Sequence, residues 1–150
     1  MHFTQFSDIG LRLLMYLAKE QRDIPPITVS EVATQFSIPK NHLVKVTGVL
    51  VKQGWITSLR GRNGGIRLAV APASLSLGKV LRVLEGEVIV ACETMQCRLL
   101  NGCSLRLALG SAINAFFDTM DEFTLEDITQ GKTGQDLSAM HASIVSFYNK

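Results

Sequence analysis

Residues 28–50 read TVSEVATQFSIPKNHLVKVTGVL, and the fold class follows from their pattern. Apolar residues recur at helical spacing in two runs, which are separated by a break at Pro39. The first run opens with Thr28 and has Glu31 three residues later, the pattern of a capping box at a helix start. The second opens at Pro39, because proline fits the first helical turn, and ends before Gly54. Two short helices joined by a tight turn predict a helix-turn-helix.

A β-hairpin is expected directly after these two helices. The β-prone runs WITSL (residues 55–59) and IRLAV (residues 66–70) flank the turn sequence RGRNGG (residues 60–65). Asparagine and glycine tolerate the positive φ angles of tight hairpin turns, so this is a strong hairpin pattern. A helix-turn-helix followed by a hairpin is a winged helix-turn-helix. The sequence therefore predicts a mainly α-helical fold with a small β wing.

Further helices are expected on both sides of this motif, because apolar residues recur there at helical spacing. From residue 131 onward the chain is polar, and we expect it to be loosely ordered until a weak helical pattern near its end. The expected helices span residues 4–22, 77–85 (capped by Ser76), 104–120 and 124–128, and the weak pattern covers 140–148.

The charge is distributed unevenly along the chain. The sequence has 150 residues, a length typical of one domain or of a small domain with an appendage, and its 47% hydrophobic content argues against a disordered chain. Residues 1–70 carry nine basic and four acidic side chains, whereas residues 71–150 carry six basic and nine acidic ones. The overall net charge of +2 is therefore the sum of +5 for the first part and −3 for the second. This division is typical of a nucleic-acid reader with a separate sensor or partner region, although scatter in small counts also produces it.

The sequence indicates a protein of the cytoplasm. It has no uninterrupted apolar run of about 18 residues, the length needed to span a bilayer. The apolar run near the N-terminus is interrupted by Asp8 and Arg12 and has no basic region before it. We therefore expect no membrane span and no signal peptide, and thiols that are kept reduced.

Basic and amide side chains gather at the start of the second motif helix. The major groove of a DNA duplex admits an α-helix, and the second helix of this motif enters it with its N-terminal residues. Asparagine can read adenine, and lysine can bond guanine or a phosphate. A solvated helix face is the alternative for any one of these residues. The full set of predicted DNA contacts, including the wing described next, is Thr28, Lys40, Asn41, His42, Lys45, Arg60, Arg62 and Asn63.

The predicted hairpin tip carries Arg60 and Arg62 at the end of a thin ribbon. Glycines in the tip let the backbone come close to another molecule. Such a wing can enter a minor groove or bind phosphates. The alternative is a flexible turn with solubilising arginines.

Three cysteines lie in the segment CETMQCRLLNGC, at Cys92, Cys97 and Cys103. An odd number excludes a closed set of disulfides within the chain. Three thiolates in one short segment favour a soft metal such as zinc, Cu(I) or the iron of an iron–sulfur cluster. A structural zinc ion needs four ligands and no Cys-x-x-Cys pair is present, so a cluster fits the long spacing better. Free cysteines and a thiol redox switch without metal remain alternatives.

Several of these segments resemble one family of regulators. The segments FSDIGLRLLMYLA (residues 6–18), VSEVATQFSIPKNHLVKV (29–46) and LRGRNGGIRLA (59–69), followed by the three-cysteine segment, are similar to the Rrf2 (Rrf-two) family of winged-helix transcriptional regulators. The resemblance covers residues 1 to about 130. Within the family it is closest to the nitric-oxide-sensing repressors.

The resemblance implies a homodimer that binds a double-stranded DNA operator. Its domain would be residues 1–130, with a DNA-binding part (1–70) and a part that holds the cluster segment and the dimerisation helix (71–130), followed by a tail (131–150). Cys92, Cys97 and Cys103 would ligate a two-iron or four-iron cluster. Asp8 would supply an oxygen ligand from the other subunit, although it also fits a helix cap. Nitric oxide would nitrosylate the cluster and release genes that protect against nitrosative stress.

Other members of the same family are the main rivals. The iron–sulfur assembly regulators of this family are expected to have a histidine three residues after the last cysteine. This chain has Arg106 at that position, which argues against that group. The iron-responsive members share three cysteines. An enzyme or electron carrier is disfavoured. No nucleophile and base have the spacing of a catalytic pair, and the histidines are scattered along the sequence.

Overall fold

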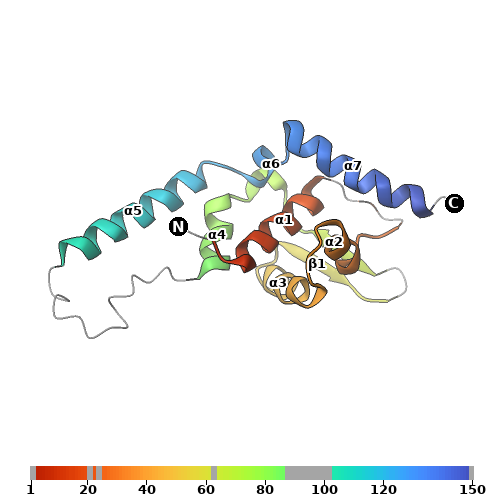
Figure 1. The fold of residues 1–150 in the computed structure, drawn as a ribbon, viewed down its shortest axis with the longest axis horizontal. Helices are drawn as coiled ribbons and strands as arrows, with labels where there is room; N and C mark the ends of the chain where they lie inside the picture. The colour runs from red at the N-terminus through yellow and green to blue at the C-terminus, as the bar shows by residue number, and fades with distance from the viewer. Residues whose placement is uncertain (1–2, 20–21, 23–24, 62–63, 87–102, 149–150) are drawn as a thin grey trace.

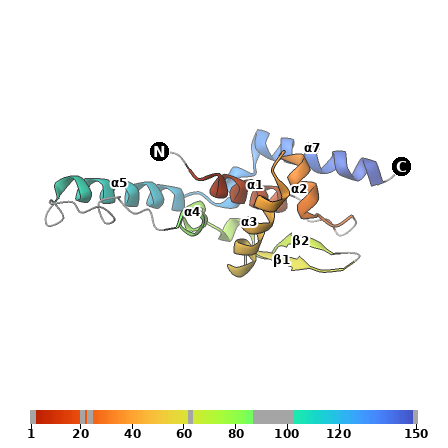
Figure 2. The same cartoon turned by 60° about the horizontal axis from the view of Figure 1, so that its bottom comes forward.

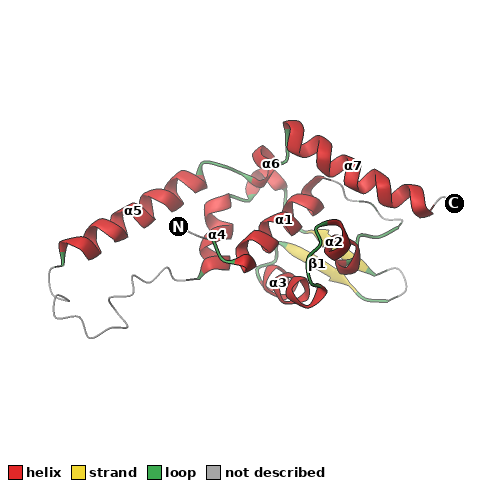
Figure 3. Ribbon diagram, viewed as in Figure 1, coloured by secondary structure: helices red, strands yellow, loops and turns green. Residues whose placement is uncertain are grey.

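The computed structural model describes residues 3–19, 22, 25–61, 64–86 and 103–148. Within them helices dominate, and the only sheet is one two-stranded hairpin (Figures 1 and 3). No helix in this part of the chain is long and apolar enough to cross a membrane. The elements are α1 (Gln5–Lys19), α2 (Val29–Gln35), α3 (Lys40–Lys52), β1 (Ile56–Leu59), β2 (Gly65–Leu68), η1 (Pro72–Ser74), α4 (Leu77–Glu85), α5 (Ser104–Asp121), α6 (Leu125–Ile128) and α7 (Gly131–Tyr148).

The predicted helix-turn-helix is formed by α2 and α3, which pack with α1 around the main core. Leucines and valines at helical spacing supply that core, because burying them removes apolar surface from water. The turn between the helices includes Ser37, whose φ of 52° is unusual for a residue other than glycine. Pro39 is the N-cap of α3, one position before the first turn where it was expected. The fully buried hydrophobic residues of the three helices are Leu13, Leu14, Tyr16, Leu17, Val32, Leu43, Val46 and Leu50.

The predicted hairpin is confirmed. Strands β1 and β2 pair antiparallel, from Ile56 opposite Leu68 to Leu59 opposite Gly65. The backbone N–H of Ile66 donates to the carbonyl oxygen of Ile27 at 2.8 Å, which fixes the hairpin to the segment before α2. A β-carbon at Gly65 would lie 2.6 Å from that same carbonyl oxygen, so this close approach requires glycine.

Two helices in the second half of the chain lie differently against the rest. Helix α5 reaches away from the helix-turn-helix and packs on α4 at its C-terminal end (Figures 1 and 2). Helix α7 packs on α1, on the side opposite to α3. Phe117 is the one buried residue of α5. The short helix predicted over residues 124–128 is α6. It begins with a capping box, in which the Thr124 hydroxyl accepts from the backbone N–H of Asp127 and the Asp127 carboxylate accepts from the backbone N–H of Thr124.

The expectation of a loosely ordered tail after Gly131 is wrong. Residues 131–148 form a single helix, α7, with Leu137 and His141 buried against α1. The sequence pattern missed its first half because most of its side chains are polar and exposed. A helix with so narrow an apolar stripe is stabilised by its tertiary contacts rather than by its own periodicity.

Candidate nucleic-acid interface and cluster segment

Helix α3 presents its predicted DNA contacts to solvent. Lys40, Asn41, His42 and Lys45 are all exposed, whereas Leu43 is completely buried. The core residues thus hold the helix against α1 and α2, and the polar residues of its first turns face outward. Pro39 makes no side-chain cap and the first turn of α3 has no acidic residue, so neither offsets the partial positive charge of the helix start. This exposed, basic helix start is suited to a phosphate-bearing duplex.

The hairpin lies beside α3 (Figures 1 and 2). Arg60 follows β1 and is exposed, as predicted for the wing. Gly61 has a φ of 106°, and its carbonyl oxygen accepts from the N–H of Gly64 at 2.9 Å, which closes the turn. The other two wing residues in the predicted set, Arg62 and Asn63, lie outside the described residues.

Thr28 acts as a helix cap in the structure. Its hydroxyl oxygen accepts from the backbone N–H of Glu31 at 3.1 Å, which is the first half of the predicted capping box. The second half is absent among the described contacts of Glu31. The Glu31 carboxylate accepts from the Tyr16 hydroxyl at 2.6 Å and from the Arg22 guanidinium. A buried charge pair thus displaced the local contact that the sequence pattern predicted.

Burial and neighbouring charges shift the pKa values of Tyr16 and Arg22 in this region. Burial raises the pKa of Tyr16 far above its ordinary value of 10.0, and the neighbouring Glu31 carboxylate raises it further. Tyr16 is therefore a neutral hydrogen-bond donor at any physiological pH. The Arg22 guanidinium keeps its charge, with a pKa raised by the hydrogen bond to Glu31 in spite of the opposing effect of burial.

Cys103 is the one predicted metal ligand of the three-cysteine set within the described residues. It is half-buried and is the N-cap residue of α5, where its side chain makes no capping hydrogen bond. Cys92 and Cys97 lie outside the described residues, and the described ones include no group of three candidate metal ligands.

Asp8 lies in the first turn of α1 and does not cap the helix. The cap contact comes from Thr4, whose hydroxyl oxygen accepts from the N–H of Ser7 at 3.2 Å. The Asp8 carboxylate is half exposed and pairs with Arg12 at 3.0 Å. The backbone N–H of Thr4 donates to Glu85 at 2.8 Å, which ties the start of α1 to the end of α4. Asp8 therefore lies one helical turn from Thr4, which contacts the last residue of α4.

The junction of α4 and α5 is held by a compact set of polar contacts. Asp121 accepts from the Ser76 hydroxyl at 2.7 Å and from Arg82 at 2.5 Å. The Arg82 guanidinium also lies 5.0 Å from the centre of the Phe117 ring. Hydrogen bonds from Ser76 and Arg82 lower the pKa of Asp121, so its carboxylate stays ionised in mild acid.

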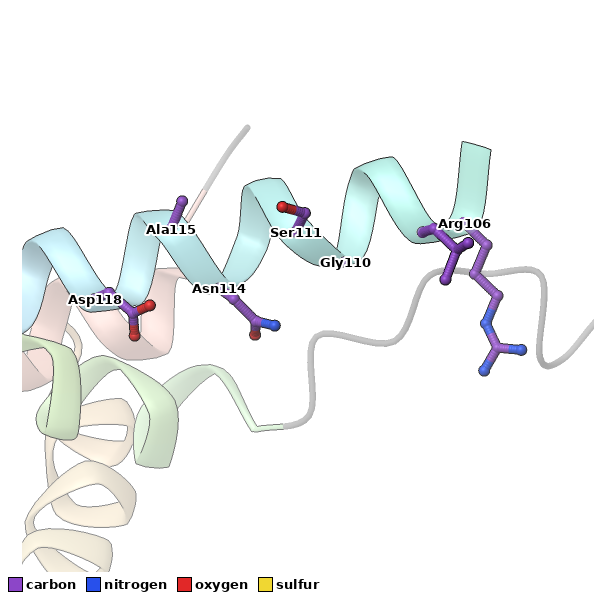
Figure 4. A pocket seen from close by; sticks show the side chains of 7 residues that line it. Arg106, Gly110, Ser111, Asn114, Ala115 and Asp118 are labelled. Carbon is purple, nitrogen blue, oxygen red and sulfur yellow. The ribbon is translucent and has the colours of Figure 1, made fainter. Parts of the chain in front are cut away.

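Sequence reasoning missed a shallow groove along α5. Arg106, Asn114 and Asp118 project to the same side of the helix there (Figure 4). Leucines are exposed on the same helix: Leu105, Leu107 and Leu109 retain 63%, 71% and 40% of their accessible surface. The described residues leave this helix largely without an apolar partner.

A comparison with protein-family models identifies the chain's relatives. Residues 3–131 match the model described as "Rrf2: Iron-dependent Transcriptional regulator". Among solved structures, a putative transcriptional regulator from Listeria innocua is 26% identical, with a TM-score of 0.70 and 89% of each chain covered. The oxidised form of Staphylococcus aureus CymR is 27% identical, with a TM-score of 0.67 over 87% of this chain and 98% of that one. T. potens IscR, 22% identical, shares the fold at a TM-score of 0.69 over 85% of each chain.

The family model spans most of the chain, including α1, the helix-turn-helix, the wing and α5. The predicted winged helix-turn-helix is confirmed by these solved structures. The resemblance to the family, given above on sequence segments, is also confirmed. The chain belongs to the Rrf2 family: it is a DNA-binding transcriptional regulator and not an enzyme.

Proposed function

We propose that this regulator is a nitric-oxide-sensitive repressor of the NsrR type, which works as a homodimer in the cytoplasm. It binds a double-stranded operator while it holds an iron–sulfur cluster, and nitric oxide releases it from genes that protect against nitrosative stress. The observation that carries the proposal is the place of Cys103. It is both the last of the three cysteines and the N-cap residue of α5, so the proposed metal ligand directly precedes the long exposed helix.

The residues around the cysteine segment have distinct parts in this proposal. The thiolates of Cys92, Cys97 and Cys103 hold the metal. The cluster, when bound, supplies the iron with which nitric oxide reacts. Asp8 is the proposed fourth ligand. It must leave Arg12 to bind iron, so their ion pair at 3.0 Å competes with ligation.

Helix α5 is the proposed dimer interface. Its exposed leucines would be covered by the same helix of a second copy. We expect Leu107→Glu to convert a dimer into a monomer in sedimentation velocity, whereas Ser138→Glu on the exposed face of α7 leaves the dimer intact. A Leu107→Glu protein that sediments as a dimer would exclude α5 as the interface.

The dimer gives a physical route from the cluster to DNA. Two recognition helices must be about 34 Å apart to enter successive major grooves. Cys103 is the N-cap of α5, and α5 is anchored on α4 through Arg82 and Asp121. A change in the charge or rigidity of the cysteine segment can therefore tilt the two DNA-binding parts relative to each other. A small change in spacing then lowers affinity for the operator.

The proposal is tested on protein purified without oxygen. We expect iron and acid-labile sulfide, and visible absorption that changes when nitric oxide is added. Cys97→Ala and Cys103→Ser should lose iron and the response to nitric oxide while keeping the fold of residues 1–70. Ser104→Ala, the neighbouring exposed position, is the matched control and should behave as the unaltered protein does.

The same preparation separates the rival functions. A colourless, iron-free protein that binds DNA and still responds to nitric oxide would establish a thiol switch without metal. Release from DNA on iron depletion, with no response to nitric oxide, would instead indicate an iron-responsive or iron–sulfur assembly regulator. Arg106, where the assembly regulators are expected to have histidine, favours the nitric-oxide sensor over that rival.

A further inference from the structure

Four side chains from three helices and one loop meet in a buried polar network behind the helix-turn-helix. They are Tyr16 of α1, Arg22 of the segment after α1, Glu31 of α2 and His141 of α7. Tyr16 and His141 are completely buried, and the side chains of Arg22 and Glu31 are 7% and 8% exposed. We call this set the Arg22 network. None of its members belongs to the predicted DNA contacts.

The guanidinium of Arg22 is the centre of the network. It donates to the carbonyl oxygen of Pro25 at 2.9 Å, to Nδ1 of His141 at 2.8 Å and to the Glu31 carboxylate. The Tyr16 hydroxyl donates to the same Glu31 oxygen at 2.6 Å. Glu31 lies in the first turn of α2, so these contacts hold that end of the helix against α1.

The hydrogen bonds fix the protonation of His141. Arginine has no acceptor atom, so Nδ1 of His141 must accept from it and carries no proton. The proton is on Nε2, which donates to the backbone carbonyl oxygen of Tyr16 at 2.9 Å. The imidazole also stacks on the Tyr16 ring, with 3.8 Å between ring centres. His141 is therefore neutral, and both of its ring nitrogens are hydrogen-bonded. It links α7 to α1 and to Arg22.

Helix α7 supplies this link from the part of the chain that follows the family match. That match ends at residue 131, where α7 begins. Gln35 of α2 adds a second contact, with its amide donating to the Ser143 hydroxyl at 3.3 Å. Since α7 packs on the side of α1 opposite to α3 (Figures 1 and 2), its effect on DNA binding must pass through α1 and α2.

We propose that α7 braces the helix-turn-helix from behind, and that His141 is a positioning residue for DNA recognition. By accepting from Arg22, His141 keeps the guanidinium on Glu31 and so fixes the start of α2. Recognition helix α3 packs on α2 and is positioned with it. The proposal concerns the DNA-binding unit alone and does not depend on the cluster or on nitric oxide.

The test compares two replacements of His141 in the full chain, purified without oxygen. His141→Phe keeps a ring on Tyr16 but offers Arg22 no acceptor, whereas His141→Asn offers an amide oxygen and loses the ring. Ala142→Asn, at the adjacent exposed position, is the matched control. Affinity is measured for a duplex selected by the unaltered protein from a randomised pool. Hydrogen exchange is followed in α2 and, for comparison, in α4.

The expected loss for His141→Phe is about tenfold in affinity, the scale of one charge-assisted buried hydrogen bond. Exchange should rise in α2 and stay unchanged in α4. His141→Asn should stay within about threefold of the unaltered affinity, because its amide oxygen can replace Nδ1.

Three results would overturn the proposal. One is a His141→Phe protein with unchanged affinity. Another is exchange that rises equally in α2 and α4, which is the result of a general loss of stability. The third is a folded His141→Asn protein whose affinity falls as far as tenfold. The affinity of the folded His141→Asn protein tests the proposal even where His141→Phe does not fold.

Discussion

The contact between α4 and α5 is tight enough that one added methyl group should disturb it. A β-carbon at Gly78 would lie 2.6 Å from the backbone carbonyl oxygen of Phe117 and closer still to the Asp121 carboxylate. Both of these residues belong to α5. A backbone carbonyl cannot rotate aside without its helix, so Gly78→Ala must push α5 away from α4 and disturb the bonds from Ser76 and Arg82 to Asp121.

The size of the effect follows from four contributions. Forcing a methyl group into a packed contact costs about 1–3 kcal/mol. Losing the hydrogen bond from Ser76 to Asp121 adds about 1 kcal/mol, and the exposed ion pair with Arg82 adds little. Alanine is the better helix former by about 1 kcal/mol, which offsets part of the loss. We therefore expect Gly78→Ala to lower the free energy of unfolding by about 1–3 kcal/mol.

Urea unfolding followed by far-ultraviolet circular dichroism measures this change. Gly48→Ala in α3 is the matched control, because a β-carbon there meets no atom within 4 Å. That variant should gain about 0.5–1 kcal/mol from helix propensity alone. A Gly78→Ala protein as stable as the unaltered chain would refute the tight α4–α5 contact. Equal changes in both variants would show that helix propensity alone decides the outcome.

Three further predictions concern the helix cap at Thr28, stability in acid and the salt dependence of DNA binding. Thr28→Ala should lower the free energy of unfolding by about 1 kcal/mol in urea titrations, whereas Thr28→Ser should keep the cap. Asp121 has a lowered pKa in the folded state, so its contribution is present above its ordinary value of 3.8 and is lost as the pH falls through the folded-state value. Asp121→Asn should remove that acid dependence of the urea midpoint. Lys40→Ala should reduce the slope of log affinity against log salt by about 1, provided Lys40 contacts a phosphate, and an unchanged slope would exclude that contact.

Local sequence patterns predicted the DNA-binding half of the molecule well. The helix-turn-helix and the hairpin depend on signals within a few residues of each other: apolar spacing, a cap at Thr28, and glycines in a turn. The same patterns indicated that Lys40 and its neighbours would be exposed, because the core positions of α3 alternate with them at helical spacing.

Contacts between distant segments could not be read from these patterns. Arg22 and His141 are 119 positions apart, and a lone histidine in a polar stretch carries no periodic signal. Glu31 fits a capping box locally, but the buried Arg22 guanidinium takes its carboxylate. Asp8 fits a cap equally well, but Thr4 makes that contact. For Glu31 and His141 a tertiary contact decided between options that the local sequence left equal, whereas for Asp8 the choice was made by the neighbouring Thr4.

The site residues divide in the same way. The thiols and the basic side chains were predicted as site residues from residue type and spacing, since few side chains can bind iron or phosphate. The groove along α5 and the exposed leucines on the same helix are seen only in the structure. Sequence periodicity indicates that a helix is apolar but does not show which residues pack on it.

The proposed function is tested most directly by one titration. Protein purified without oxygen, with its iron and sulfide counted, is bound to a fluorescent operator duplex, and nitric oxide is added while anisotropy and visible absorption are recorded together. We predict that affinity falls roughly hundredfold as the absorption changes, since a coupling of a few kcal/mol is needed to move the regulator from mostly bound to mostly free. Unchanged affinity while the absorption changes would contradict the proposal, and so would an equal response from iron-free Cys103→Ser protein.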